Sequence, residues 1–125
     1  MLDAFGSPVK IGIVYTCVSK GRYSDEFAER FIGSYKKFPP GTAHELLIGF
    51  NGGPPPAKLR TMFEGVVHGH HVRSNLGWDL GLFQEVSARW DVALMVCFGE
   101  SVYFHRSGWL VPMYEAVKQY GAGMY

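Results

Sequence analysis

The sequence predicts an α/β fold in which a mainly parallel sheet of four strands has helices on both faces. Strand-like and helix-like segments alternate along the chain, and this alternation favours parallel strands joined by helical crossovers. Each strand-like segment ends in polar or glycine-rich residues. With 125 residues, of which 47% are hydrophobic and 18% charged, the chain (1–125) has the size and composition of a single folded domain.

The first two strands and the helices after them are marked clearly by the residues around them. Residues 10–18 are almost continuously apolar, as expected of a central parallel strand. A helix is expected from Ser24, its N-cap, to about residue 38, where two prolines stop it. The second strand is expected at 45–51, and a short helix over about 57–63 follows a run of prolines.

The second half of the chain repeats the alternation. Residues 66–72 combine β-branched residues with histidines and predict the third strand. Asp79 is the expected cap of a helix that runs to about residue 89, and the very apolar segment 92–98 is the fourth strand. A last helix is expected from Val111 until Gly121 ends it. Its apolar stripe is expected to consist of Met113, Ala116, Val117 and Tyr120.

Composition argues against several classes of partner. The formal net charge is +1 and the basic residues are scattered, so we expect no nucleic-acid partner. No stretch approaches the ~20 apolar residues of a membrane span, and residues 1–6 lack the basic and apolar parts of a signal peptide. Cys17 and Cys97 form no CxxC pair, and we expect two reduced thiols in a cytoplasmic protein.

Polar residues follow the strands at their carboxyl ends, which is where open parallel sheets bind ligands. The sequence therefore predicts a cleft for a polar ligand, lined by Thr16, Asn51, Asn75, Asp79 and Glu100. Two phosphate-binding loops are missing, because the sequence has neither GxxxxGK[ST] nor a GxGxxG after the first strand.

Two further groups of residues each have two interpretations. The first group, His68, His70 and His71, is either a metal site or a set of ordinary strand histidines. On a strand, the His71 side chain faces away from the other two, and no carboxylate or thiol lies at the spacing of a further metal ligand. Both observations favour ordinary strand histidines. The segment 75–81, with its two glycines, is either a ligand-binding turn or an ordinary loop in which Asp79 caps a helix, and both can hold together.

Taken in order, these segments resemble the nucleotide-sugar-binding half of glycosyltransferases with the GT-A fold, in particular the family-two group. The resemblance implies a sheet in the spatial order 3-2-1-4 and a base-binding segment at the end of the first strand. It also implies that Asn51 contacts the base or ribose and that a loop rich in Asn and Gly follows the third strand. The nucleotide-sugar site implied in this way consists of Tyr15, Thr16, Cys17, Asn51, Arg73, Asn75, Gly77, Asp79 and Glu100.

The expected function is that of a glycosyltransferase, or of its donor-binding domain, acting on a nucleoside diphosphate sugar. In the family a DxD motif holds the metal, and here Phe98-Gly-Glu-Ser101 stands in its place, leaving Glu100 as the single acidic ligand for Mn²⁺ or Mg²⁺. The family's acceptor-binding stretch and its catalytic base lie beyond the point where this chain ends, so we expect either the N-terminal part of a longer enzyme or a short relative that needs a partner. Within the chain His105 and Glu100 are the candidate bases. The alternative is a non-catalytic module that binds a ligand or a partner chain.

The implied strand order has consequences for the cysteines and for assembly. The first and fourth strands become neighbours, so Cys17 and Cys97 are expected to lie close together without a bond. The fourth strand becomes an edge with no charge or proline over 92–98, which predicts a homodimer paired through that edge. Trp90, Trp109 and Tyr114 would add apolar surface to the interface. The alternative is that residues 101–110 fold back as a covering strand.

Overall fold

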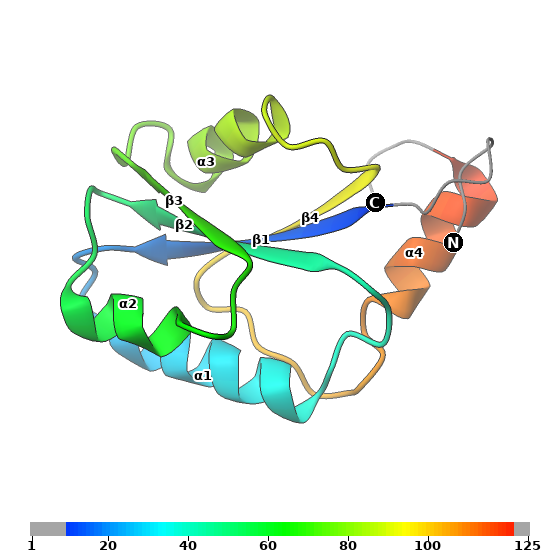
Figure 1. Ribbon diagram of the computed structural model, residues 1–125, viewed down its shortest axis with the longest axis horizontal. Coiled ribbons are helices and arrows are strands. Elements are labelled where there is room, and N and C mark those ends of the chain that lie inside the picture. The colour runs from blue at the N-terminus through cyan, green and yellow to red at the C-terminus, as the bar shows by residue number, and fades with distance from the viewer. Residues whose placement is uncertain (1–9, 122–125) are drawn as a thin grey trace.

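The computed structural model describes residues 10–121 and has an α/β fold with a four-stranded, all-parallel sheet in the order β3-β2-β1-β4 (Figure 1). The predicted fold class and strand order are therefore confirmed. The elements are β1 (Ile11–Val18), α1 (Ser24–Lys37), β2 (Glu45–Asn51), α2 (Ala57–Phe63), β3 (Gly69–Arg73), α3 (Trp78–Ser87), β4 (Leu94–Phe98) and α4 (Val111–Tyr120).

The helices form a layer on each side of the sheet. The main core lies between the sheet and α1 and α2, where Tyr15 and Phe31 stack with ring centroids 3.8 Å apart. On the opposite face α3 packs through Leu82 and Val86 against Val14 of β1. Alternate strand residues point to opposite faces, so Thr16 and Asn51 lie on the α3 side while Tyr15 and Cys17 lie on the α1 side.

Glycines in the strands allow the α3 layer to approach the sheet closely. A methyl group on Gly49 of β2 would overlap the side chain of Leu82, and one on Gly12 of β1 would overlap the ring of Trp90. Both glycines lie on the α3 side of the sheet. The short distance between α3 and the sheet therefore depends on these two positions having no side chain.

Some element boundaries differ from the prediction. Strand β3 starts at Gly69 and not at residue 66, because the amides of Val66 and Val67 bond back to the Phe63 carbonyl in a turn after α2. Strand β4 starts at Leu94, two residues later than expected. Ser24 is the first residue of α1 and not its cap, and its hydroxyl donates to Glu100.

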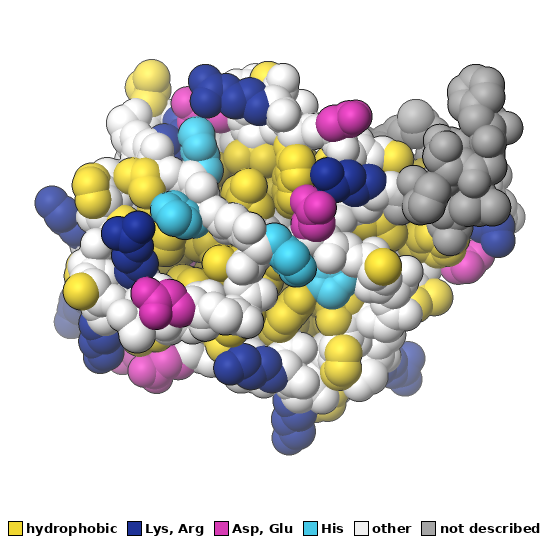
Figure 2. Space-filling view, in the orientation of Figure 1, with side chains coloured by type: hydrophobic (Ala, Val, Ile, Leu, Met, Phe, Trp, Pro, Cys, Tyr) yellow, Lys and Arg dark blue, Asp and Glu magenta, His cyan; other side chains and the backbone are white. Residues whose placement is uncertain are grey.

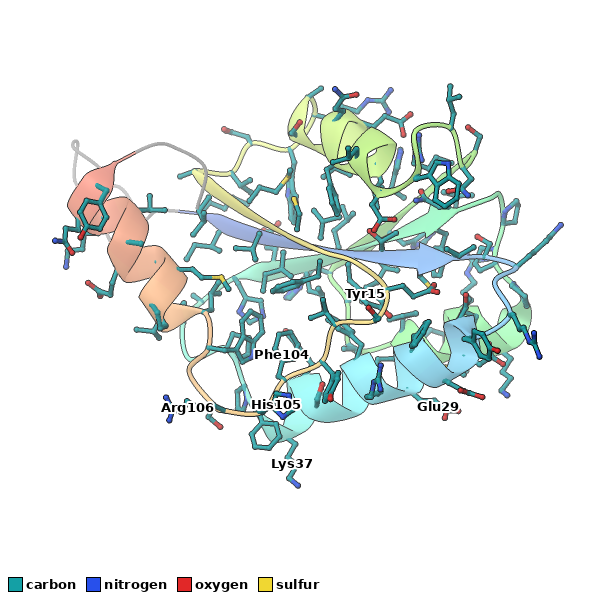
Figure 3. The ribbon with its side chains drawn as sticks, turned by 180° about the vertical axis from the view of Figure 1, so that it is seen from behind. Tyr15, Glu29, Lys37, Phe104, His105 and Arg106 are labelled. Atoms are coloured by element: carbon teal, nitrogen blue, oxygen red, sulfur yellow. The ribbon has the colours of Figure 1, made fainter. Side chains whose placement is uncertain are left out.

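The expected apolar stripe of α4 is not buried. No residue of α4 is buried, and Met113 and Tyr120 are exposed. In Figures 1 and 3, α4 lies toward the amino ends of the strands and not over a face of the sheet. Three aromatic residues expected to add apolar surface there, Trp90, Trp109 and Tyr114, are instead partly buried against the two core clusters. They keep only part of their surface exposed, and a contribution to an interface stays a prediction.

The segment after β4 does not form the alternative covering strand. It follows α1, where the Phe104 amide donates to the Ser34 hydroxyl at 3.0 Å and Phe104 stacks on Trp109 (Figure 3). Within residues 10–121 the sheet contains four strands, and β4 is one of its edges. The backbone of β4 that faces away from β1 therefore has no strand partner in this part of the chain.

Both cysteines are free thiols, as expected, but they are not neighbours. The register places Cys97 beside Val14, three residues before Cys17, and the two side chains point to opposite faces of the sheet. The expectation that the thiols lie close together is therefore wrong. Among residues 10–121, no helix has the length and apolar character needed to cross a membrane.

Candidate functional site

The carboxyl edge of the sheet has two sides, and on the α1 side the polar groups are used within the fold. The Glu100 carboxylate accepts hydrogen bonds from the Val18 amide at 2.5 Å and from the Ser24 hydroxyl at 3.0 Å. The Tyr15 hydroxyl donates to the Glu100 carbonyl at 2.6 Å. Glu100 thus joins the end of β4 to the corner between β1 and α1, where the helix dipole favours a negative charge.

This network sets the chemistry of the predicted residues Tyr15, Cys17 and Glu100. Burial, followed by the nearby Glu100 carboxylate, raises the pKa of the Cys17 thiol far above its ordinary value. Burial likewise raises the pKa of the Tyr15 hydroxyl. Both groups stay protonated at neutral pH and act as donors. Over residues 10–121, no group of three or more His, Cys, Asp or Glu side chains is placed to share a metal ion.

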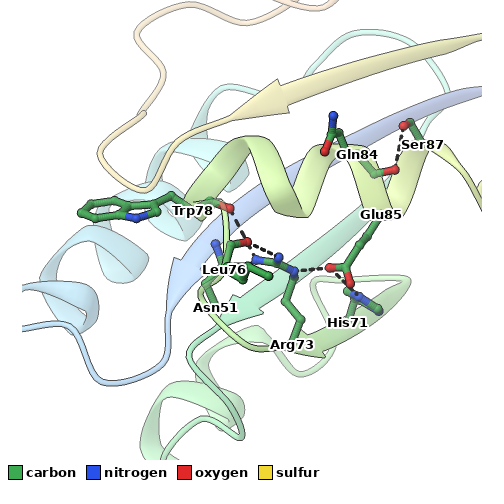
Figure 4. Close-up of polar contacts among 8 residues, drawn as sticks. All are labelled: Asn51, His71, Arg73, Leu76, Trp78, Gln84, Glu85 and Ser87. Atoms are coloured by element: carbon green, nitrogen blue, oxygen red, sulfur yellow. Dashed lines mark hydrogen bonds and ion pairs between the residues drawn. The ribbon is translucent and has the colours of Figure 1, made fainter.

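On the α3 side of the edge, Arg73 is the centre of a second network (Figure 4). Its side chain is only 7% exposed and donates from every guanidinium nitrogen. Nη1 donates to the Asn51 side-chain oxygen at 3.0 Å and to the Trp78 carbonyl at 3.4 Å. Nη2 donates to the Leu76 carbonyl at 2.5 Å, and Nε pairs with the Glu85 carboxylate. These contacts show that Arg73 organises the β3–α3 segment, and its predicted part in ligand binding stays a prediction.

Among residues 10–121, three buried side-chain atoms on the α3 side have no hydrogen-bond partner, and they belong to Thr16, Asn51 and His71. The Thr16 hydroxyl and the Asn51 side-chain nitrogen are shielded from solvent, and both residues are 0% exposed. They lie on the same face of the neighbouring strands β1 and β2, close to the carboxyl ends of both. A buried donor without a partner costs about 1–3 kcal/mol, so the fold carries a cost at these two positions that a ligand could remove.

Asp79 completes this side of the edge. Its carboxylate lies against Gly99, and an added Cβ on that glycine would be 3.3 Å from Asp79 Oδ2. Because Phe98 is paired with Tyr15, Gly99 is the next position along and lies beside Thr16. Burial raises the pKa of Asp79. Asn51, Thr16 and Asp79 therefore follow one another across the α3 side of the edge.

The segment between β3 and α3 presents large apolar side chains to solvent. Leu76, Trp78 and Leu80 are 81%, 75% and 75% exposed. Trp78 is the non-glycine residue with a positive φ, 56°, and it follows Gly77 at 74°. Left-handed backbone costs a bulky residue about 1–2 kcal/mol, so this turn is strained and Arg73 holds it in place. Asn75 and Gly77, predicted as ligand-binding residues, are exposed in the same segment.

A shallow hollow of about 160 Å³ lies on the α3 face, and one of its lining residues, Glu85, pairs with Arg73. Figure 2 shows histidine side chains on this side of the molecule among apolar ones, with basic and acidic residues nearby. The hollow is smaller than a typical ligand pocket of about 300–1,000 Å³. It is lined by Leu47, His70, His71, Glu85, Val86, Arg89 and Trp90.

The strand histidines have different structural surroundings. The His68 ring accepts a hydrogen bond from the Leu46 amide at 2.8 Å, and the His70 ring packs against Phe50. His71 lies on the α3 side, 3.7 Å from the Glu85 carboxylate. The three side chains therefore do not converge on one point.

The structure divides the predicted site residues into groups. Tyr15, Cys17 and Glu100 lie together on the α1 side. On the α3 side Arg73 bonds Asn51, whereas Thr16 lies on the neighbouring strand and Asp79 lies against Gly99. His105 belongs to neither group: Figure 3 shows it toward the far end of α1, near Lys37, so it is not placed to act as a base at this edge. The contacts of Ser24 with Glu100 and of Glu85 with Arg73 could not be predicted from the sequence, because each joins residues distant along the chain.

Comparison of the chain with protein-family models, with curated proteins and with solved structures finds no match.

Proposed function

We propose that the chain is the donor-binding domain of a glycosyltransferase, and that it binds a nucleoside diphosphate sugar at the α3 side of the carboxyl edge. The observation that supports this most is a pair of solvent-shielded atoms without a partner among residues 10–121, Thr16 Oγ1 and Asn51 Nδ2, near the ends of adjacent parallel strands. Ligands of open parallel sheets bind at this edge. Glu100 occupies the α1 side with its own contacts, which leaves the α3 side for the ligand.

A thermal-shift screen with UDP, GDP and their sugars, each with and without Mn²⁺, tests this proposal. A ligand at one hundred times its Kd stabilises the folded state by about 2.7 kcal/mol, so a true donor raises the Tm by several degrees. The Asn51→Ala variant should weaken binding by about 1–3 kcal/mol. Gln119→Ala, on an exposed position of α4, is the control. If no nucleotide shifts the Tm of the wild type, the proposal is wrong.

Binding requires movement, because both partner-free atoms are inaccessible to solvent. The β3–α3 segment is the part that would open, since it is exposed and carries the strained Trp78. Nucleotide binding should therefore change the fluorescence of Trp78, and a Trp78→Phe variant should lose this change while Trp90 and Trp109 remain. A change that persists in that variant would show that a different region moves.

The second candidate is a non-catalytic module that binds a partner chain. The exposed side chains of Leu76, Trp78 and Leu80 favour it, because clustered apolar residues on a surface commonly mark interfaces. The same thermal-shift screen discriminates between the two candidates: nucleotide binding supports the first, and no response to any nucleotide favours the second.

We also propose that the chain forms a homodimer in the cytoplasm, with the two β4 edges paired. Support comes from the position of β4 at the edge of the sheet and from its apolar sequence. Edge strands of this kind are usually protected in monomers.

A further inference from the structure

We infer that the segments at the carboxyl ends of β1, β2 and β3 dock on the surface of a membrane that contains anionic lipids. These carboxyl-end segments are residues 19–23, 52–58 and 74–80. Their apolar side chains would enter the boundary between headgroups and acyl chains, and their basic side chains would lie against the headgroups. Docking of this kind goes beyond the proposed function, because it uses side chains that point into solvent and not the buried groups of Thr16 and Asn51.

The first observation is the exposure of large apolar side chains in the segment 74–80. Leu76, Trp78 and Leu80 are 81%, 75% and 75% exposed, and Tyr23 in the segment 19–23 is 48% exposed. A side chain that is three-quarters exposed has little protein around it, so it projects from the molecule and does not line a flat face. Projecting Trp and Leu side chains can enter a lipid surface directly, whereas a protein partner must supply a fitted pocket for them.

The second observation is the backbone that carries these side chains. The carbonyls of Leu76 and Trp78 accept hydrogen bonds from the buried Arg73 guanidinium, so the main chain of this turn is bound to the fold while its side chains are left in solvent. Figure 4 shows the Trp78 ring extending away from this network. The φ of Trp78 is 56°, a left-handed conformation that is unfavourable for a bulky residue. Exposure of the ring to water is unfavourable as well, and insertion into a membrane would relieve it.

The three carboxyl-end segments lie side by side. The Ser19 amide donates to the Asn51 carbonyl at 2.8 Å, and the Ser19 hydroxyl donates to the Gly53 carbonyl at 2.5 Å. The amides of Gly52 and Gly53 both donate to the Arg73 carbonyl, at 2.9 and 2.8 Å. Because β1, β2 and β3 are parallel, the segments project from the same end of the sheet, to which the strand arrows of Figure 1 point. They therefore form one surface.

The third observation is the charge of this surface, which favours an anionic membrane. The carboxyl-end segments contain three basic residues, Lys20, Arg22 and Lys58, and one acidic residue, Asp79. Lys58 pairs with Asp25 of α1 at 3.2 Å, whereas Lys20 and Arg22 form no ion pair within residues 10–121. Figure 2 shows basic side chains beside apolar ones at this end of the molecule, on the left of the view. Each basic residue near an anionic bilayer strengthens binding by about fivefold.

Flotation of the wild-type chain with lipid vesicles tests the inference, without any nucleotide present. One set of vesicles contains phosphatidylcholine alone, and the other contains phosphatidylcholine mixed with phosphatidylserine. We expect the chain to float with the mixed vesicles and to bind the uncharged ones at least about tenfold more weakly. Added salt should release the chain from the mixed vesicles, because it screens exposed charges.

The apolar side chains are tested by substitution at exposed positions. Leu76→Ser combined with Leu80→Ser should weaken binding to the mixed vesicles by at least about tenfold, because less apolar surface leaves water. Tyr120→Ser, at a position of α4 that is 69% exposed, is the matched control and should bind as the wild type does. Tryptophan emission should shift to shorter wavelength on binding, and Trp78→Phe should still float but lack this shift.

The basic side chains are tested in the same way. Lys20→Gln combined with Arg22→Gln should weaken binding to the mixed vesicles by about tenfold or more and leave binding to the uncharged ones unchanged. Lys36→Gln combined with Lys37→Gln makes the same change of charge at the opposite end of α1 and should bind as the wild type does. Circular dichroism checks that each variant keeps its fold.

The outcomes separate docking from the proposed function. A wild type that floats with neither set of vesicles overturns the inference and leaves the exposed side chains to a protein partner. Equal binding to both sets, or unchanged binding in the Leu76→Ser and Leu80→Ser double variant, also overturns it. None of these results alters the thermal-shift screen with nucleotides, so nucleotide binding and membrane docking stand or fall separately.

Discussion

At the scale of single residues, the cost of an unsatisfied hydroxyl gives a direct prediction for Thr16. Its hydroxyl is shielded from solvent and has no hydrogen-bond partner in the described part of the chain, so Thr16→Val removes a buried polar group and keeps the shape of the side chain. We expect the free energy of unfolding without ligand to rise by about 1 kcal/mol, and the affinity for a nucleotide to fall.

Urea denaturation monitored by circular dichroism measures the first effect. The same substitution at the exposed Thr61 is the control and should change stability by less than about 0.5 kcal/mol. A loss of stability in Thr16→Val would mean that the hydroxyl already has a partner in the unliganded protein.

The Glu85 carboxylate gives a prediction about pH. The hydrogen bond from Arg73 lowers its pKa below the ordinary 4.5. A lowered pKa in the folded state stabilises the protein above the unfolded pKa, and this contribution is lost as the pH falls through the folded pKa. Glu85→Gln should therefore be less stable than the wild type at pH 7, with a difference that shrinks below about pH 4.5. The effect is small, because the Glu85 side chain is 42% exposed.

Denaturation at several pH values checks this expectation, with Glu64→Gln, an exposed glutamate after α2, as the control. A constant difference between Glu85→Gln and the wild type from pH 7 down to pH 3 would contradict it.

At the scale of elements, the contact between α3 and the sheet depends on glycine. In Gly49→Ala the new methyl group would overlap Leu82, so α3 must shift outward, and we expect a loss of about 1–3 kcal/mol in stability. Gly33→Ala is the matched control. Gly33 is exposed in the middle of α1 with no atom near an added Cβ, and alanine there should stabilise the helix by about 0.5–1 kcal/mol. Equal effects at the two positions would contradict this account.

The sequence was sufficient to predict the helices and strands and their order, and it predicted part of the candidate site. Glycine and proline after Asn51 mark the end of β2 and the start of α2, and both elements have the predicted bounds. Thr16, Asn51 and Asp79 were predicted from their position near the ends of strands, which is a local property, and their role in a site stays a prediction. The role of Arg73 could not be found, since its partner Glu85 is twelve residues away and on a helix whose facing side depends on packing.

At the scale of the whole molecule, the open edge of β4 predicts self-association. The Leu94 amide donates toward β1, to the Lys10 carbonyl, so the amide of Met95 points away from the sheet. Pairing of two β4 strands about a two-fold axis would satisfy this outward row of backbone groups. Light scattering at micromolar concentration should give the mass of a dimer.

Met95→Pro removes an outward donor and should convert the dimer to a monomer, provided that circular dichroism shows an intact fold. Thr61→Val, on α2 and away from β4, is the control and should stay dimeric. A monomer mass for the wild type would contradict the assembly.

The bonds of Glu100 also bear on how the chain folds. They join residues that are 82 and 76 positions apart, and they close the corner beside the central strand. Contacts between distant positions form slowly, because the loop between them must be ordered first. Strand β1 is the first to be synthesised, yet it gains β4 as a neighbour only after the other strands have been made. Until then one side of the most buried strand is open, and the nascent chain is most vulnerable to aggregation during that interval.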